Sequence, residues 1–193
     1  YGMAETTLMV SGSRRKVAPI ISQIDATALE SNRVKKIGQG QEYTRAIVGC
    51  GQTFLDQKIL IVEPETLTAC PPDRVGEIWV SSPSVAQGYW HRTEETEQTF
   101  NAYLADTGAG PFLRTGDLGF LQDGELFITG RIKDVIIIRG QNHYPQDIEL
   151  TVEKSHPALR PSFGAAFTAE IKGEERLVIV QEVERTYLRK LNV

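Results

Sequence analysis

Short apolar and β-branched runs, separated by Gly, Pro and Asp, dominate the chain before Asp134. The clearest of these runs, Lys58–Val62 and Gly76–Ser81, predict two strands. Two further apolar runs, at residues 118–121 and 126–129, flank Asp123-Gly124, a dipeptide typical of two-residue hairpin turns. The pattern therefore predicts a strand-rich segment that ends in a β-hairpin.

Two segments have the terminal signals of helices. Thr93–Phe100 carries a residue suited to an N-cap, Thr93, and two glutamates in its first turn. Pro145 is suited to the first position of a second helix, which we expect to end before His156-Pro157. Between the two helices, Val135–Ile138 predicts a short buried strand.

The last part of the chain has a different pattern from the first. Residues 163–168 and 176–184 predict two strands around a turn at Lys172-Gly173-Glu174. A strand-rich region thus gives way to a β-α-β-β order near Asp134, which predicts two domains, residues 1–133 and 134–193. Arg14–Ile47 contains Gly38-Gln39-Gly40, so we expect short strands and turns there rather than a long helix. The predicted fold class is α+β and β-rich.

Composition narrows the classes of protein that fit. The 193 residues carry a net charge of −4 without a basic block, which argues against nucleic-acid binding. No apolar run approaches the roughly 20 residues of a membrane helix. Cys50 and Cys70 lack metal-ligand spacing and are expected to be reduced, partly buried thiols of a cytoplasmic protein. The three histidines are scattered along the chain, so the sequence does not suggest a metal site built from them. Because the chain begins at Tyr1 and not at a methionine, we expect it to be a piece of a longer protein.

Four polar positions are candidates for binding, each with a simpler alternative. In Arg114-Thr115-Gly116-Asp117, a polar turn, the carboxylate could hold a diol such as ribose, although Thr-Gly-Asp is also a common turn sequence. Arg131 could hold a ribose hydroxyl or a phosphate, or form a surface salt bridge. Lys133-Asp134 could be a hinge or a solvated junction. Glu5 could hold a magnesium ion or be an ordinary turn carboxylate.

The order of these motifs carries more information than any one of them. The chain lacks Gly-x-x-x-x-Gly-Lys-Ser/Thr, Gly-x-Gly-x-x-Gly and a readable Ser/His/Asp or Cys/His grouping. However, YGMAE, GEIWVSSPSVAQGYW, RTGD and GRIKDVIIIRG follow one another between residues 1 and 140. In this order the chain resembles the adenylate-forming superfamily, which comprises acyl-CoA synthetases, peptide-synthetase adenylation domains and luciferase-like enzymes.

Within that superfamily the chain looks most like the fatty acyl-AMP ligases. Three features carry the closer match: the segment Tyr1–Thr6, the segment Gly140–Glu149, and the long interval between Ser13 and Cys50-Gly51. The resemblance implies a family insertion within that interval, near residues 14–47. It also implies a distorted β-barrel subdomain of the large domain, followed by the first part of a small C-terminal lobe.

The resemblance also implies roles for individual residues. Tyr1 and Gly2 match the segment beside the adenine of ATP, and Glu5 matches the glutamate associated with magnesium. Asp117 matches the carboxylate that binds both ribose hydroxyls, and Arg131 matches an arginine that reaches the ribose or phosphate. Lys133 and Asp134 match the hinge about which the small domain rotates.

The activity implied for the parent protein is that of a fatty acyl-AMP ligase. Such ligases form acyl-AMP and pyrophosphate from ATP and a fatty acid, and then pass the acyl group to the thiol of an acyl carrier protein. They serve lipid, polyketide or lipopeptide biosynthesis. The family's phosphate loop and catalytic lysine lie outside these 193 residues, so we assign no catalytic residue here and expect the piece alone to be inactive. Two alternatives stay open: an acyl-CoA synthetase or amino-acid adenylation domain, and a non-catalytic nucleotide-binding or interaction module.

Overall fold

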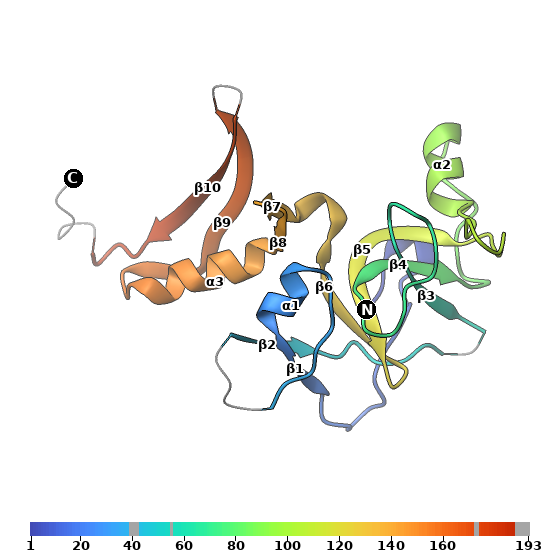
Figure 1. The fold of residues 1–193 in the computed structure, drawn as a ribbon, viewed down its shortest axis with the longest axis horizontal. Coiled ribbons are helices and arrows are strands. Elements are labelled where there is room, and N and C mark those ends of the chain that lie inside the picture. The colour runs from blue at the N-terminus through green and yellow to red at the C-terminus, as the bar shows by residue number, and fades with distance from the viewer. Residues whose placement is uncertain (39–42, 55, 172–173, 188–193) are drawn as a thin grey trace. The chain divides into compact units, whose positions relative to one another are not determined.

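The computed structural model describes residues 1–38, 43–54, 56–171 and 174–187. The chain divides into two compact units, Tyr1–Ile132 and Lys133–Val193 (Figure 1). The predicted turn at Lys172-Gly173, and part of the Gly38-Gln39-Gly40 segment, lie outside the described residues. No helix among the described residues has the length and apolarity that a membrane span requires.

The first unit is built mainly from short strands. Its strands are β1 (Ile21–Asp25), β2 (Thr44–Val48), β3 (Lys58–Val62), β4 (Gly76–Ser81), β5 (Leu113–Gln122) and β6 (Glu125–Arg131). Its helical segments are η1 (Ala4–Thr6), α1 (Ala26–Glu30) and α2 (Thr93–Phe100), and η2 (Ile132–Asp134) begins at its end. The strands predicted at residues 58–62 and 76–81 are confirmed as β3 and β4.

An antiparallel sheet in the order β3-β4-β5-β6 forms the centre of the first unit. Strand β4 is buried on both faces, because consecutive side chains point to opposite sides of a strand. Ile78 and Val80 join a core cluster that includes Phe100 of α2, whereas Trp79 belongs to a second cluster with Phe112. Burial on both faces explains why β4 reads as a nearly continuous apolar run.

The hairpin predicted at Asp123-Gly124 is confirmed. Gln122 pairs with Glu125 across the turn, and both turn residues have positive φ, 53° for Asp123 and 79° for Gly124. This is the backbone that a type I′ turn requires, and its twist matches that of the flanking strands. Behind the turn, the rings of Phe120 and Phe127 stack with centroids 5.0 Å apart.

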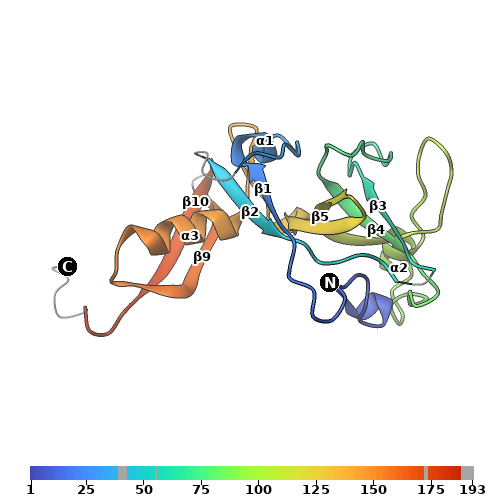
Figure 2. The same ribbon diagram turned by 90° about the horizontal axis from the view of Figure 1, so that it is seen from below.

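The strand-rich α+β class is confirmed, but no sheet among the described residues closes into a barrel. Strands β1 and β2 form a separate antiparallel pair (Figure 2). The outer edge of β6 pairs instead with a short extended segment, in which the Cys50 amide donates to the Leu126 carbonyl at 2.7 Å. The outer edge of β3 pairs with its own return segment, where the Cys70 amide donates to the Ile61 carbonyl at 2.8 Å. Each outer edge of the sheet is therefore paired with a nearby segment of the chain, so the sheet does not need to close into a barrel to cover its edges.

Two local predictions need correction. The predicted Thr93 cap is wrong, because Arg92 occupies the N-cap position of α2 and makes no side-chain capping bond. Helical hydrogen bonding already begins at Arg92, whose carbonyl accepts from the Thr96 amide at 2.9 Å. The predicted turn at Arg114–Asp117 is also wrong, because these residues lie inside β5.

The second unit begins with the short pair β7 (Ile136–Ile138) and β8 (Gln141–His143). Helix α3 (Pro145–Ser155) follows, with Pro145 at its start as predicted. Strands β9 (Leu159–Ile171) and β10 (Glu174–Val183) then pair antiparallel, and β9 packs along α3 (Figure 2). In the β7 pair the predicted burial holds only in part, because Ile136 is buried and Ile137 is 61% exposed.

Candidate functional site

The Arg114-Thr115-Gly116-Asp117 segment is a bulge in the ladder between β4 and β5. Glu77 pairs with Leu118 and Trp79 pairs with Arg114, so three residues of β5 lie opposite Ile78 alone. We call residues Thr115–Asp117 the β5 bulge. Gly116, at its centre, has φ 71°, and nothing lies within 4 Å of the position of a Cβ atom there. Backbone conformation, rather than lack of space, therefore favours glycine at this position.

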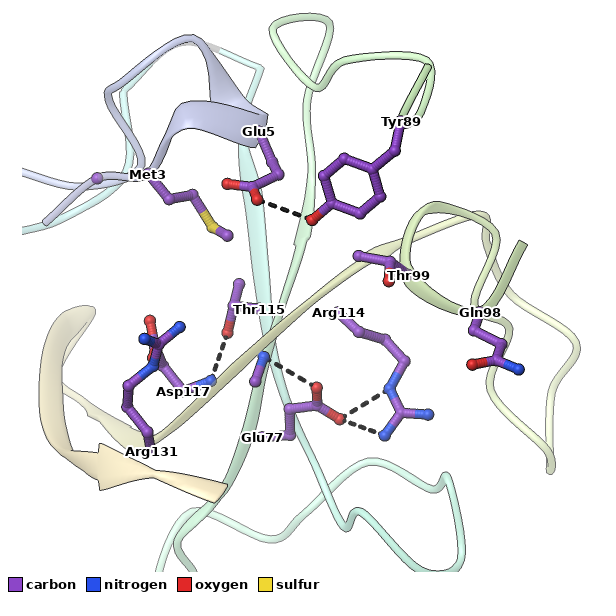
Figure 3. A pocket seen from close by; sticks show the side chains of 12 residues that line it. Met3, Glu5, Glu77, Tyr89, Gln98, Thr99, Arg114, Thr115, Asp117 and Arg131 are labelled. Carbon is purple, nitrogen blue, oxygen red and sulfur yellow. Dashed lines mark hydrogen bonds and ion pairs between the residues drawn. The ribbon is translucent and has the colours of Figure 1, made fainter. Parts of the chain in front are cut away.

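A polar cavity of about 670 Å³ lies over the β5 bulge (Figure 3). It brings together segments from distant parts of the first unit: the N-terminal segment, β4, α2 and the β5–β6 hairpin. The lining residues are Gly2, Met3, Glu5, Glu77, Tyr89, Gln98, Thr99, Arg114, Thr115, Gly116, Asp117 and Arg131. Four of the residues chosen from sequence, Gly2, Glu5, Asp117 and Arg131, therefore share one cavity.

Asp117 is held by a different partner at each carboxylate oxygen. The Arg131 Nε lies 2.9 Å from Oδ1, and the Tyr1 hydroxyl donates to Oδ2 at 2.5 Å. Burial, followed by the hydrogen bond to this carboxylate, raises the pKa of Tyr1 above its usual range, so Tyr1 stays a donor at neutral pH. Thr115 adds a contact to the backbone, because its hydroxyl accepts from the Asp117 amide at 3.1 Å. The side chain of Asp117 is thus oriented before any ligand binds.

Glu5 lies in η1 and faces the same cavity. Its Oε1 accepts a hydrogen bond of 2.8 Å from the Tyr89 hydroxyl (Figure 3). Burial, with a smaller contribution from this hydrogen bond, raises the pKa of Tyr89 to about 12. Among the described residues, no three His, Cys, Asp or Glu side chains come together as a metal site. A magnesium ion needs only one or two protein carboxylates when phosphates and water supply the other ligands, so Glu5 fits that use.

The N-terminal segment is folded tightly beside Glu5. The carbonyl of Tyr1 accepts from the amides of Val10 and Ser11, at 3.0 and 3.1 Å. A Cβ atom added to Gly2 would lie 1.5 Å from the Leu8 carbonyl oxygen, so only glycine fits at this position. The close approach fixes the segment that carries Tyr1 on one side of the cavity.

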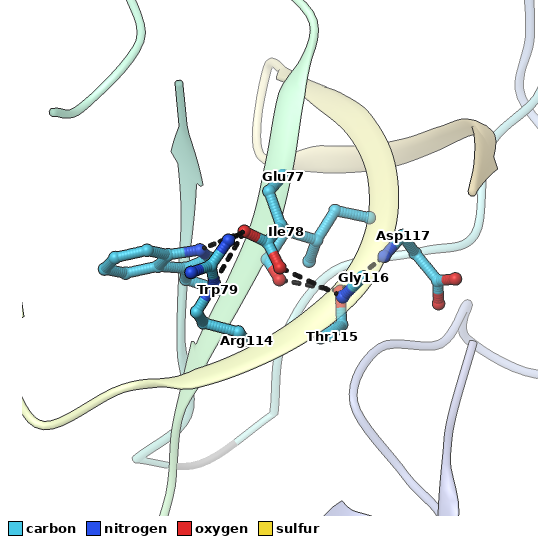
Figure 4. A network of polar contacts seen from close by, with 7 residues as sticks. All are labelled: Glu77, Ile78, Trp79, Arg114, Thr115, Gly116 and Asp117. Carbon is cyan, nitrogen blue, oxygen red and sulfur yellow. Dashed lines mark hydrogen bonds and ion pairs between the residues drawn. The ribbon is translucent and has the colours of Figure 1, made fainter. Parts of the chain in front are cut away.

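The sequence motifs gave no separate role to Tyr89, Glu77 or Arg114, and Figure 4 shows the contacts of the last two. Glu77 is 2% exposed, and its carboxylate forms an ion pair of 2.8 Å with Arg114. Glu77 stands in the otherwise apolar run of β4, next to Ile78. A charge in such a run must be paired when the strand is buried, and this was the signal that could have found it.

Lys133 and Asp134 lie outside this cavity. They end the η2 segment and begin the second unit, where they line a separate cavity of about 400 Å³ with residues of α3 and β9, among them Glu149 and Phe167. Cys50 and Cys70 are both free and half-buried, as expected.

Known proteins that resemble this chain agree on one superfamily. Residues 1–90 match the family described as AMP-binding enzyme. The medium-chain-fatty-acid–[acyl-carrier-protein] ligase JamA of Moorena producens is 60% identical over 195 residues, which cover 100% of this chain and 33% of that relative. Along its whole length the chain is similar to adenylate-forming enzymes. The resemblance inferred from the order of the motifs is therefore confirmed.

Solved structures of adenylate-forming enzymes match the chain along nearly its whole length. One, from work on the fatty acyl-adenylate ligases of E. coli and L. pneumophila, is 32% identical with a TM-score of 0.79 and covers 98% of this chain and 33% of that chain. Another is a fatty acyl-adenylate ligase from L. pneumophila in complex with acyl adenylate and pyrophosphate. It is 40% identical with a TM-score of 0.66 and covers 97% of this chain and 32% of that chain. The chain thus spans about a third of the length of these relatives.

Proposed function

We propose that the chain is part of a fatty acyl-AMP ligase. In this reaction a fatty acid and ATP form acyl-AMP and pyrophosphate, and the acyl group then passes to the thiol of an acyl carrier protein. The 60% identity to an enzyme named as a fatty-acid–[acyl-carrier-protein] ligase supports the choice of substrate and acceptor. The observation that carries the proposal is the polar cavity in which Asp117, oriented by Arg131 and Tyr1, faces the same space as Glu5.

In this proposal Asp117 binds the two ribose hydroxyls of ATP. A carboxylate offers about four lone-pair sites, so Asp117 can accept from a diol while it keeps contacts with Arg131 and Tyr1. Arg131, whose side chain is 51% exposed, is free to turn its remaining N–H groups toward a ribose or phosphate oxygen. Fixing the ribose in this way positions the α-phosphorus for attack by the fatty-acid carboxylate.

Glu5 and the N-terminal segment supply the other contacts to the nucleotide. Glu5 would provide one carboxylate to a magnesium ion, which would neutralise charge on the phosphates when bound. The Tyr89 hydroxyl keeps the Glu5 carboxylate in a fixed direction toward the cavity. Tyr1 and Gly2 would contact the adenine, with the ring of Tyr1 against the base and the glycine backbone beside it.

Lys133 and Asp134 are proposed as the hinge of a two-step enzyme. Both half-reactions would use one active site, and a rotating small domain would exchange the groups that cover it. The support is that Lys133 begins the second compact unit and lies within the short η2 segment. A short polar connection is suited to absorbing backbone rotation.

Reaction of the full-length protein with ATP, magnesium and fatty acids of graded chain length tests the proposal. We expect pyrophosphate release that depends on the fatty acid, and transfer of the acyl group to the phosphopantetheine thiol of a carrier protein. Efficient transfer to free coenzyme A would instead identify an acyl-CoA synthetase, and exchange that depends on an amino acid would identify an adenylation domain. Nucleotide binding without any exchange would identify a non-catalytic module.

A further inference from the structure

A buried carboxylate stands at the base of the β5 bulge. Glu77 is 2% exposed and lies in β4 next to the core residue Ile78. Burial of a charge is costly unless the charge is paired and hydrogen-bonded. The contacts of Glu77 therefore indicate which part of the structure this carboxylate stabilises. The β5 bulge is the only part of β5 that leaves the regular ladder with β4 among the described residues of these two strands.

The two oxygens of Glu77 have separate tasks (Figure 4). Oε2 accepts from Trp79 Nε1 at 2.9 Å and from Arg114 Nε at 3.0 Å. Oε1 accepts from the backbone amide of Gly116 at 3.1 Å. Oε2 therefore pairs with the positive charge of Arg114 in the cavity wall, and Oε1 binds the backbone of the β5 bulge.

Glu77 replaces the acceptor that the bulge removes from the Gly116 amide. In a regular antiparallel ladder the partner strand would supply a carbonyl, but Gly116 has no partner residue in β4. Thr115 completes the arrangement, because its hydroxyl donates to the Ile78 carbonyl at 2.7 Å and accepts from the Asp117 amide at 3.1 Å. The side chains of Glu77 and Thr115 thus satisfy two backbone amides within the bulge and fix the backbone that carries Asp117.

We propose that Glu77 is a positioning residue for nucleotide binding, which acts on Asp117 through the backbone of Gly116. The proposal rests on the proposed function, in which Asp117 holds the ribose. Glu77 binds the backbone amide of Gly116, the residue before Asp117, and does not contact the Asp117 carboxylate itself. It therefore affects the position of Asp117 before ATP binds. Its loss weakens ATP binding and leaves the fatty-acid step unchanged.

Glu77→Gln in the full-length protein tests this proposal. An amide has one acceptor oxygen, whereas both oxygens of Glu77 accept, so glutamine loses either the Gly116 contact or the Arg114–Trp79 contacts. We expect the KM for ATP to rise about tenfold, the size of losing one charge-assisted hydrogen bond. The kcat at saturating ATP and the KM for fatty acid should stay within about twofold.

Glu125→Gln is the matched control. Glu125 is also a buried carboxylate, 6% exposed, and accepts from a backbone amide, that of Gly51 at 2.7 Å, but it does not line the cavity. We expect this variant to lose thermal stability and to keep the KM for ATP. Equal effects of the two variants on the KM for ATP, or an unchanged KM in Glu77→Gln, would overturn the positioning role.

Thr115→Val is a second variant in case Glu77→Gln folds poorly. It keeps the shape of the side chain and removes the hydroxyl between the Ile78 carbonyl and the Asp117 amide. It should raise the KM for ATP in the same direction, and an unchanged KM would count against the proposal. Failure of the proposed function is distinguishable, because the unmodified full-length protein would then form no acyl-AMP or would not pass the acyl group to a carrier protein.

Discussion

Asp117 and Arg131 lie directly opposite each other in β5 and β6 because β6 contains one extra residue. From the turn to Gly119 the register is regular, with Gly119 opposite Ile128. It then shifts by one, so that Leu118 faces Gly130 and Asp117 faces Arg131. Without this shift Gly130 would lie opposite Asp117 and the ion pair of 2.9 Å could not form in this way.

Replacement of Asp117 tests the role of this pair. Asp117→Ala in the full-length protein removes the carboxylate proposed to hold the ribose, together with the partner of Arg131. We expect the KM for ATP to rise about 10- to 100-fold, as for the loss of hydrogen bonds to a charged group. Pyrophosphate exchange at sub-saturating ATP measures the change. Asp123→Ala, at the exposed hairpin turn, is the control and should have no such effect.

Stability of the hairpin depends on its turn residues. Gly124→Ala places a Cβ on a residue with φ 79°, so we expect it to lower the free energy of unfolding by about 1–2 kcal/mol. Gly38→Ala is the control, because nothing lies within 4 Å of a Cβ there and the effect should be below about 0.5 kcal/mol. Urea denaturation followed by tryptophan fluorescence compares them. Equal stability of the two variants would contradict the turn assignment.

Sequence reasoning succeeded where the signal is local. The strands β3 and β4 and the turn at Asp123-Gly124 follow from residue types within a few positions of one another. It failed at the β5 bulge, because Thr-Gly-Asp reads the same in a turn and in a bulge. The difference is set by Glu77, which lies on another strand and binds the Gly116 amide.

The candidate site shows the same division. The family resemblance found four of the residues that line the cavity, including Glu5 and Asp117, because each lies in a recognisable motif. Residues that support them, such as Tyr89, which donates a hydrogen bond to Glu5, required the fold, since their partners are remote in sequence. The pairing of the outer edges of β3 and β6 could not be predicted from local patterns either, because each edge pairs with a segment of a loop.

Reactivity of Cys70 should reflect its burial. Burial, with a smaller contribution from the negative charge of Glu63, raises the pKa of the Cys70 thiol to about 11. In a Cys50→Ser variant, alkylation by iodoacetamide should therefore keep rising about tenfold per pH unit between pH 8 and pH 10. In urea the rate should level off near the ordinary thiol pKa. A native plateau at the same pH as in urea would refute the shielding of Cys70.

Stability at alkaline pH should depend on Tyr89. Its pKa of about 12 in the folded protein lies above its ordinary value, so the native state keeps a proton that the unfolded state loses. The stability that this proton contributes is complete below about pH 10 and is lost as the pH rises toward 12. Tyr89→Phe should flatten the fall of Tm above pH 10, whereas Tyr103→Phe, on an exposed loop, should leave it unchanged. An identical fall in both variants would contradict the assignment.

Because β6 contains one extra residue, the pairing of Asp117 with Arg131 depends on the number of residues between the turn and Arg131. Most positions between the turn and Arg131 can exchange apolar side chains and preserve the pairing of the two strands. Insertion of a single residue after Thr129 would instead keep the turn and, with the shift of one residue unchanged, bring Gly130 opposite the carboxylate. In relatives or redesigned versions of this hairpin, an inserted residue in β6 is therefore a stronger sign that the proposed nucleotide site is lost than several substitutions are.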